Sequence, residues 1–469
     1  MSKAKIICTI GPSCDSEEIL TKLIESGMNV ARLNFSHGNH SDHFKKIKII
    51  RKLSKKLKVP IAILQDLQGP KIRIGTFEKP PIHLNPGDRF TITTNNVTGN
   101  QQKVSTSYKN LANDVNVGDR ILINDGLIKL EVKDKTDTDI YCEVKNGGSL
   151  YDRRGINLPG IKISEPSLTR KDKDDLKFGL ENGVDYVAMS FVRDANSVRQ
   201  VKKFMKDKKV PVIAKLEKPE ALENLEDIIE ESDGIMVARG DLGVEISASR
   251  VPVVQKEIIE KCLMAGKPVI TATQMLDSMI VNPIPTRAET SDVANAIFDG
   301  SDAVMLSGET AFGKYPVESV KMMHSIIEDA EKKESYFRLN PVDFFCETKN
   351  EFSLSICHSA YYAASEINAR YIVVFTKSGY TAEVMSNFRP KVPILALTPS
   401  EKTLYTLALN WGVIPALLDK NYDISEDLSP LENFLKKNNW MKKGDNIVII
   451  AGSSQNEGGT NLLRLHTLQ

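Results

Sequence analysis

V-I-A-K-L-E (Val212–Glu217) and D-G-I-M-V-A-R-G-D-L-G-V-E (Asp233–Glu245) are two apolar runs that end in charged residues, with a helical pattern between them. This alternation is typical of a parallel βαβ unit. Lys215 and Glu217 are two residues apart, so on an extended segment they point to the same side. The second run delivers three residues to the turn that opens the next helix: Arg239, Gly240 and Asp241. These groups suit a divalent metal and an anionic substrate, although salt-bridged loop edges explain them equally well.

The same alternation of strand and helix extends over two stretches of the chain. We expect eight strands, at Lys5–Ile10, Met28–Phe35, Val59–Asp66, Tyr186–Ser190, Val210–Lys215, Gly234–Ala238, Lys267–Thr271 and Asp302–Leu306. Eight βα units in about 250 residues are typical of a (β/α)8 barrel. The prediction is an α/β fold whose core is a (β/α)8 TIM barrel, built from residues 1–70 and 160–335.

Residues 71–159 follow a different pattern. Short alternating runs are separated by turn signals such as N-P-G-D, V-G-D-R, N-D-G and K-N-G-G. This predicts an all-β module, a β-barrel lid domain inserted after strand three. The insertion point lies at the catalytic end of the barrel, where a mobile lid belongs.

Residues 334–350 are expected to be a linker, and residues 350–469 return to α/β alternation. Five strands are predicted there: Tyr371–Phe375, Ile394–Thr398, Val413–Leu418, Ile447–Ala451 and 461–468. We expect a separate, open C-terminal α/β domain.

Bulk composition narrows the class of protein. The net charge is +1 and 41% of the 469 residues are hydrophobic, which is typical of a soluble globular protein and argues against a nucleic-acid partner. No apolar run approaches a membrane span, and the first residues lack a signal-peptide pattern, so a cytoplasmic location is expected. The six cysteines have no metal-binding spacing: Cys8, Cys14, Cys142, Cys262, Cys346 and Cys357.

Polar side chains collect where the barrel strands are expected to end. They come from six strands: Arg32, Asn34, Ser36 and His37; Asp66, Lys71 and Arg73; Lys215 and Glu217; Gly240 and Asp241; Thr273; Ser307 and Glu309. Any one of them has a structural explanation, such as a salt bridge or a helix cap, but the set points to a site. Two carboxylates suit Mg²⁺ or Mn²⁺ completed by water and phosphate oxygens. The arginines and lysines suit a phosphoryl group.

Seven motifs in order along the chain resemble pyruvate kinase. They are M-N-V-A-R-L-N-F-S-H-G, D-L-Q-G-P-K-I-R, I-A-K-L-E, D-G-I-M-V-A-R-G-D-L-G-V-E, G-K-P-V-I-T-A-T-Q-M-L, P-T-R-A-E-T-S-D-V-A-N-A and M-L-S-G-E-T-A. The resemblance implies a barrel, a β lid and a C-terminal regulatory domain. It implies an enzyme that transfers phosphate from phosphoenolpyruvate to ADP, giving pyruvate and ATP in the last step of glycolysis. By analogy with the family it also implies a homotetramer.

The resemblance implies roles residue by residue. Lys215 resembles the lysine that neutralises the migrating phosphoryl group, and Arg32 resembles the arginine that holds it. Glu217 and Asp241 resemble the Mg²⁺ ligands. The N–H groups of Gly240 and Asp241, with Thr273, resemble the site of the substrate carboxylate. Arg239 is expected to be only a salt-bridging neighbour.

Two further groups of roles follow from the same resemblance. Thr273, Ser307 and Glu309 lie in motifs near the waters that deliver a proton to the enolate, and which group protonates it stays open. Four residues resemble contacts to the nucleotide phosphates: Asn34, His37, Arg73 and Arg154.

One departure concerns monovalent cations. Many family members need potassium and carry a glutamate in G-P-E-I-R, whereas this chain has Leu67, Gln68 and Lys71. That resembles the potassium-independent branch, in which a lysine ammonium replaces the ion. We expect Lys71 to stand in place of K⁺ near three residues, Asn34, Ser36 and Asp66. The alternative is that Lys71 is merely solvated and those three residues still bind potassium.

A second anion site is expected in the C-terminal domain at T-K-S-G-Y-T. Its hydroxyls, glycine and helix start form an anion cradle, or else an ordinary capped turn: Thr376, Lys377, Ser378, Gly379 and Thr381. The resemblance implies an allosteric effector here, a sugar phosphate or a nucleotide. The opposite wall, Gly452–Thr460, carries no arginine or lysine, which favours a monophosphate over a bisphosphate.

Two other functions compete with this interpretation. A magnesium-dependent lyase or mutase acting on pyruvate-like substrates uses a similar barrel, but it needs neither a lid nor Arg73. A catalytically silent metabolite sensor needs only the C-terminal loop, and the intact set around Lys215 argues against it.

Overall fold

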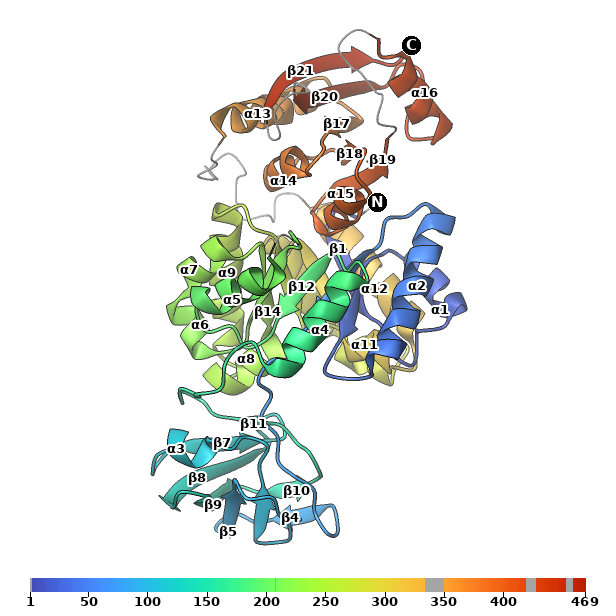
Figure 1. Ribbon diagram of the computed structural model, residues 1–469. Helices are drawn as coiled ribbons and strands as arrows, with labels where there is room; N and C mark the ends of the chain where they lie inside the picture. The colour runs from blue at the N-terminus through green and yellow to red at the C-terminus, as the bar shows by residue number, and fades with distance from the viewer. Residues whose placement is uncertain (1, 207, 334–349, 419–426, 453–458) are drawn as a thin grey trace.

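The computed structural model describes residues 2–206, 208–333, 350–418, 427–452 and 459–469. Eight parallel strands close into a barrel in the order β1-β16-β15-β14-β13-β12-β3-β2 (Figure 1). They are β1 (Lys5–Thr9), β2 (Met28–Asn34), β3 (Ala62–Asp66), β12 (Tyr186–Met189), β13 (Val212–Leu216), β14 (Gly234–Ala238), β15 (Val269–Ala272) and β16 (Ala303–Leu306). The eight-stranded barrel predicted from the sequence is confirmed. The expected linker lies outside the described residues except for Asn350.

Several helices around the barrel begin after a residue whose side chain accepts a hydrogen bond from a free backbone N–H group. The Ser16 side chain accepts a hydrogen bond from the Ile19 N–H at the start of α1 (Glu17–Glu25). Capping boxes open α4 (Arg170–Glu181) at Thr169 and α10 (Arg287–Phe298) at Thr286. The remaining barrel helices are α2 (His40–Leu57), α5 (Ala195–Met205), α6 (Pro219–Glu223), α7 (Leu225–Glu231), α8 (Arg239–Ile246), α9 (Val251–Met264), η1 (Asp277–Ile280), α11 (Gly308–Ala311) and α12 (Pro316–Glu331).

The C-terminal part of the chain covers the N-terminal end of the barrel. Ala408 and Leu409 of η4 (Leu407–Leu409) belong to the same buried cluster as the residues that fill the barrel interior. The Tyr186 hydroxyl donates to the Thr406 carbonyl at 2.6 Å, and Lys5 Nζ donates to the Val413 carbonyl at 2.7 Å. This leaves the opposite end, where the strands finish, for a functional site.

The insert between β3 and α4 lies at that opposite end (Figure 1). Its strands pair as a six-stranded sheet, β11-β7-β8-β9-β5-β6, and a two-stranded sheet, β10-β4; their hydrogen-bond order is open, where a β-barrel was expected. The elements are β4 (Ile82–Leu84), β5 (Arg89–Thr93), β6 (Lys103–Ser105), α3 (Leu111–Asp114), β7 (Arg120–Ile123), β8 (Ile128–Lys135), β9 (Asp139–Asn146), β10 (Gly148–Leu150) and β11 (Ile156–Asn157). The insert has a hydrophobic core of its own, which includes Phe90 and Leu130.

The C-terminal part forms a five-stranded sheet in the order β19-β18-β17-β20-β21, with only β21 antiparallel. Its elements are α13 (Glu351–Glu366), β17 (Tyr371–Phe375), α14 (Tyr380–Asn387), β18 (Ile394–Thr398), α15 (Glu401–Thr406), η4, β19 (Val413–Leu417), α16 (Ser429–Lys437), β20 (Asn446–Gly452) and β21 (Thr460–Thr467). The open α/β architecture is therefore confirmed. None of the described helices is long and apolar enough to cross a membrane.

Candidate active site

Four charged side chains meet at the C-terminal end of the barrel. Arg32 lies on β2, Asp66 ends β3, and Lys215 lies on β13 with Glu217 just after it. Lys215 Nζ lies 3.1 Å from Asp66 Oδ1 and 2.9 Å from Glu217 Oε1. Arg32 Nε lies 2.6 Å from Asp66 Oδ2. No side chain of the four is more than 11% exposed, so the two cations and two anions form one buried network.

Mutual attraction sets the ionisation of this network. Burial lowers the pKa of Lys215, but Asp66 and Glu217 outweigh burial and the pKa lies above its ordinary value. Burial raises the pKa of Asp66, but Lys215 and Arg32 outweigh it and the pKa lies below its ordinary value. At neutral pH the site therefore holds an ammonium and a carboxylate in contact.

Two neutral hydroxyl residues complete the network, and sequence reasoning missed both. Lys215 Nζ donates to Ser190 Oγ at 2.7 Å, and Ser190 Oγ donates to the Leu67 carbonyl at 2.7 Å. Arg32 Nη1 donates to Thr9 Oγ1 at 2.8 Å. Thr9 and Ser190 stand at the ends of strands one and four, which carry no charged residue at this rim. Their position at a strand end was the signal that could have identified them.

Glu217 and Asp241, the two residues expected to bind a metal, carry carboxylates that interact electrostatically. Burial raises the pKa of Glu217, Lys215 lowers it, and repulsion by Asp241 raises it again, so the pKa lies above its ordinary value. Two carboxylates that repel each other at this end of the barrel fit a hard divalent cation. The described residues contain no group of three or more His, Cys, Asp or Glu side chains arranged for a metal. A magnesium ion here would need water and substrate oxygens as further ligands, as Mg²⁺ sites commonly do.

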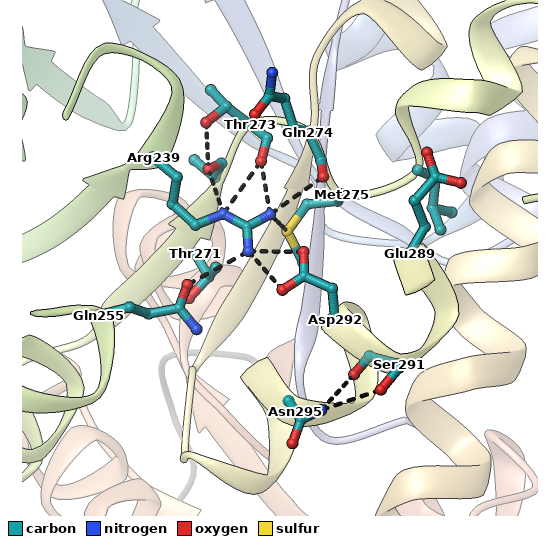
Figure 2. Close-up of polar contacts among 12 residues, drawn as sticks. Arg239, Gln255, Thr271, Thr273, Gln274, Met275, Glu289, Ser291, Asp292 and Asn295 are labelled. Carbon is teal, nitrogen blue, oxygen red and sulfur yellow. Dashed lines mark hydrogen bonds and ion pairs between the residues drawn. The ribbon is translucent and has the colours of Figure 1, made fainter. Parts of the chain in front are cut away.

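Gly240 and Thr273, both expected at the substrate carboxylate, contact each other. The Gly240 N–H donates to Thr273 Oγ1 at 2.7 Å, and Thr273 Oγ1 donates to the Ala272 carbonyl at 2.6 Å. Thr273 and Gln274 have φ angles of 71° and 54°, a conformation that costs a non-glycine residue on the order of 1–3 kcal/mol. Arg239 forms the expected ion pair, to Asp292 at 2.7 Å, and it also contacts this strained turn (Figure 2).

The side chains of Glu309 and Ser307 differ in whether they form hydrogen bonds. Glu309 Oε1 accepts from the Leu276 N–H at 3.0 Å, and Oε2 accepts from the Ser307 N–H at 2.7 Å. Burial raises the pKa of Glu309. Glu309 therefore braces two loops of the rim. The Ser307 hydroxyl is buried and has no hydrogen-bond partner within the described ranges.

The side of the rim that faces the insert is positively charged. Burial lowers the pKa of His37, and Arg73, Lys71 and Arg32 lower it further. Arg73 Nη1 donates to the Arg153 carbonyl at 3.0 Å. Four residues that were predicted to bind phosphate or to replace a cation therefore lie within electrostatic range of one another: His37, Arg73, Lys71 and Arg32. Such a concentration of positive charge is what a polyphosphate requires.

The other predicted residues on this side are placed as follows. Arg154 is exposed in the insert, with its guanidinium 5.4 Å from the Tyr151 ring centroid. Asn34 Oδ1 accepts from the Ser36 N–H at 3.0 Å, so this amide oxygen shapes the turn after β2. Lys71 forms no ion pair within the part of the chain that the structure describes.

The return of the insert to the barrel is tied down by a buried ion pair. Lys218 Nζ lies 2.6 Å from Glu245 Oε1, and Asn157 Nδ2 donates to the same oxygen at 3.1 Å. Asn157 ends β11, and Glu245 lies on α8. Sequence reasoning gave no role to Lys218 or Glu245, although both lie in or beside the two opening motifs.

The predicted anion cradle in the C-terminal part leads into α14. Gly379 has a φ of 99° and its N–H donates to Thr376 Oγ1 at 2.9 Å. Thr381 Oγ1 lies 2.6 Å from Thr460 Oγ1, while Lys377 and Ser378 are exposed. Of the expected opposite wall, residues 453–458 lie outside the described residues.

Known proteins of one family match this chain over nearly its whole length. A family model described as "Pyruvate kinase, barrel domain" matches residues 1–320, and one described as "Pyruvate kinase, alpha/beta domain" matches residues 354–466. A pyruvate kinase of Staphylococcus saprophyticus is 46% identical over 475 residues, covering 99% of this chain and 80% of the relative. Pyruvate kinases of Staphylococcus epidermidis and Staphylococcus aureus are each 45% identical over 474 residues, with the same coverage.

Proposed function

Because the chain belongs to the pyruvate kinase family, we propose that the barrel rim around Lys215 carries the family's phosphoryl transfer. The enzyme is a phosphotransferase that converts phosphoenolpyruvate and ADP to pyruvate and ATP. We assign the roles of individual residues from the resemblance of their motifs to the family, and their contacts and charges support the assignment.

Lys215 and Arg32 receive the phosphoryl group. Both cations are buried, and their partners Asp66 and Glu217 hold them in place. Phosphoryl transfer is catalysed mainly by positioning and by neutralising negative charge on the moving group. Lys215 Nζ neutralises the migrating group between donor and acceptor, while Arg32 orients the phosphate of phosphoenolpyruvate.

Glu217 and Asp241 would hold the Mg²⁺ that the family generally uses. The ion, when bound, supplies positive charge to the substrate oxygens and the developing enolate. Gly240, Asp241 and Thr273 orient the substrate carboxylate. Because the Gly240 N–H is already bonded to Thr273 Oγ1, a carboxylate must compete for or join that hydrogen bond.

After transfer, the enolate of pyruvate takes a proton on its methylene carbon. Ser307, whose hydroxyl has no hydrogen-bond partner among the described residues, is the residue that we assign to the water that passes this proton. Thr273 lines the same path, and Glu309 fixes the backbone of Ser307. On the insert side Asn34, His37, Arg73 and Arg154 contact the phosphates of ADP.

The observation that carries the proposal is the Lys215 ammonium held between two carboxylates at the open end of the barrel. The test is a coupled assay of pyruvate formation from phosphoenolpyruvate, with and without ADP and Mg²⁺. Pyruvate formation must require both. Release of pyruvate without ADP would instead indicate a lyase or phosphatase.

Lys71 replaces a monovalent cation in this chain. Support comes from Asp66, whose two carboxylate oxygens already contact Arg32 and Lys215 and have little charge left for potassium. The positive charge of Lys71 reaches His37, beside Asn34 and Ser36. Activity in potassium-free buffer is expected to equal activity with potassium. Strong stimulation by potassium would contradict this role.

The loop Thr376–Thr381 binds a monophosphorylated effector, a sugar phosphate or a nucleotide. The paired threonine hydroxyls, the N–H groups at the start of α14 and the exposed Lys377 and Ser378 support this assignment. Titration of such phosphates should shift the phosphoenolpyruvate saturation curve, and a Ser378→Glu variant should lose the shift. No shift with any of them would make the loop structural.

The assembly is a homotetramer in the cytoplasm. Large apolar side chains stand exposed in the segments that follow β15 and β16, among them Val281, Ile284 and Phe312, which supports a protein interface. The five described cysteines are unpaired and buried, which fits a reducing compartment. Light scattering coupled to size-exclusion chromatography tests the oligomer, and cell fractionation tests the location.

A further inference from the structure

Arg239 makes a dense set of contacts around the end of β15 (Figure 2). Its Nη2 donates to the Thr273 carbonyl at 2.7 Å, and its Nε lies 3.2 Å from the same oxygen. The carbonyls of Ala272 and Gln274 are each 3.3 Å away. On the other side Nη1 contacts Asp292 at 2.7 Å and Gln255 Oε1 at 3.4 Å. One guanidinium thus binds three consecutive carbonyls and is itself held by two helices.

Those carbonyls belong to the most unusual backbone of the site. Thr273 and Gln274 are consecutive non-glycine residues with positive φ, and Thr273 is β-branched, for which this conformation is rare. Such a turn persists only when its surroundings hold it. The Arg239 side chain is 10% exposed, so its hydrogen bonds to this turn are largely shielded from water.

The same segment is attached a second time through the next residue. Gly240 follows Arg239, and its N–H donates to Thr273 Oγ1 at 2.7 Å. The side chain of Arg239 therefore binds the carbonyl of Thr273, while the backbone N–H of Gly240 donates a hydrogen bond to the hydroxyl of Thr273. Together these contacts set the distance between the Thr273 hydroxyl and the start of α8.

We propose that Arg239, held by Asp292, is a positioning residue that presents Thr273 and Gly240 to the carboxylate of phosphoenolpyruvate. This inference rests on the proposed function, which places that carboxylate at Gly240 and Thr273. Arg239 does not touch the substrate. It acts by maintaining a strained turn in the one geometry that lets both groups face the same oxygen atoms.

A lysine at this position keeps the charge and can still pair with Asp292. It lacks the planar fork, so it cannot bind three carbonyls and a carboxylate at once. Arg239→Lys is therefore the informative variant. A matched control exists at the opposite end of the barrel, where Arg51 donates to the Ile61 and Gly183 carbonyls at 3.0 and 2.7 Å and pairs with Asp185 at 2.7 Å. Arg51→Lys removes the same kind of clamp far from the site.

The experiment measures KM for phosphoenolpyruvate, KM for ADP, kcat and the melting temperature of both lysine variants. Arg239→Lys should raise KM for phosphoenolpyruvate about tenfold or more, because small misplacement of an orienting group is costly. KM for ADP should stay within about twofold, since the nucleotide uses other residues. Arg51→Lys should leave both KM values within about twofold, whatever it does to the melting temperature.

Asp292→Asn provides a second variant if Arg239→Lys fails to fold. It keeps the shape of the side chain but weakens the hold on the guanidinium, and it should raise KM for phosphoenolpyruvate selectively. Equal changes in both KM values, or no change in a folded variant, would overturn the proposal and leave Arg239 a purely structural residue.

Thr273→Val separates this inference from the proposed site. If Thr273→Val raises KM for phosphoenolpyruvate while Arg239→Lys does not, only the positioning role is wrong. If Thr273→Val has no effect, the carboxylate does not bind at Thr273, and the proposed site fails together with the inference.

Discussion

Replacing Lys215 with methionine should damage stability and catalysis by separable amounts. The ammonium lies 3.1 Å from Asp66 and 2.9 Å from Glu217 in a buried network. Removing one partner of a buried ion pair leaves an uncompensated charge, which costs about 3–5 kcal/mol of unfolding free energy. Asp66 keeps Arg32, so the unpaired group is Glu217, whose pKa is already raised mainly by burial.

The loss of stability in Lys215→Met should depend on pH. A carboxyl whose folded pKa is raised above its unfolded value binds more protons in the folded state, so the free energy of unfolding falls as pH rises. The deficit relative to the parent should therefore be smaller at acidic than at neutral pH. Urea unfolding followed by circular dichroism across this range measures it.

Catalysis should suffer far more than stability in this variant. A cation that neutralises a transferring phosphoryl group is worth about 10³-fold or more in kcat. Lys218→Met is the matched control, because Lys218 is equally buried and pairs with Glu245 at 2.6 Å only a few residues away. It should lose comparable stability but less than about tenfold in kcat. A Lys215→Met enzyme with kcat within tenfold of the parent, or equal losses in both variants, would refute the role of Lys215.

Three further outcomes are expected. In Gly11→Ala the new Cβ would lie 2.4 Å from the Ala311 carbonyl oxygen, and because both are backbone-bound the free energy of unfolding in urea should fall by about 1–3 kcal/mol. Burial lowers the pKa of Lys5 to about 8, so between that pH and the ordinary lysine pKa the unfolded chain binds more protons than the folded one. The free energy of unfolding should therefore rise by about 1–3 kcal/mol as the pH rises through this window. Urea unfolding at several pH values measures the rise, and Lys5→Met should abolish it. Burial raises the pKa of Cys14 to about 11 and that of Cys357 to about 12, so iodoacetamide at neutral pH should label neither in the native enzyme, as peptide mass spectrometry would show; rapid labelling would contradict their burial.

The barrel could be predicted because its signals are local and repeated. Each strand is a short apolar run, and several of the barrel helices have a recognisable start, as at Ser16, Thr169 and Thr286. The insert could also be predicted, since β-turn signals replace the helical spacing of apolar residues from residue 71. Because parallel strands end at one rim, the convergence of Arg32, Asp66 and Lys215 followed from the count of strands.

The finer structure of the site could not be predicted, because it depends on contacts between distant residues. Ser190 and Thr9 are ordinary hydroxyl residues in sequence, and only the closed barrel places them against Lys215 and Arg32. The left-handed turn at Thr273 could not be predicted from the sequence for a stronger reason. A β-branched residue there contradicts local preference, so the conformation must come from tertiary contacts such as those of Arg239.

The hydrogen-bond partners of a buried arginine or lysine indicate whether the residue serves catalysis or holds the fold together. Arg239 and Arg51 donate mainly to backbone carbonyls, which need a donor permanently once they are buried. Among the described residues, Lys215 forms hydrogen bonds or ion pairs with the side chains of Asp66, Glu217 and Ser190, and Arg32 does so with those of Asp66 and Thr9. Neither cation donates to a described backbone group, so both can bind the phosphate proposed above without breaking a hydrogen bond within a strand. A buried ionic network often stabilises a protein less than apolar residues of the same size would. Its presence at the open end of the barrel, with partners that can rearrange, is therefore better explained by chemistry than by folding.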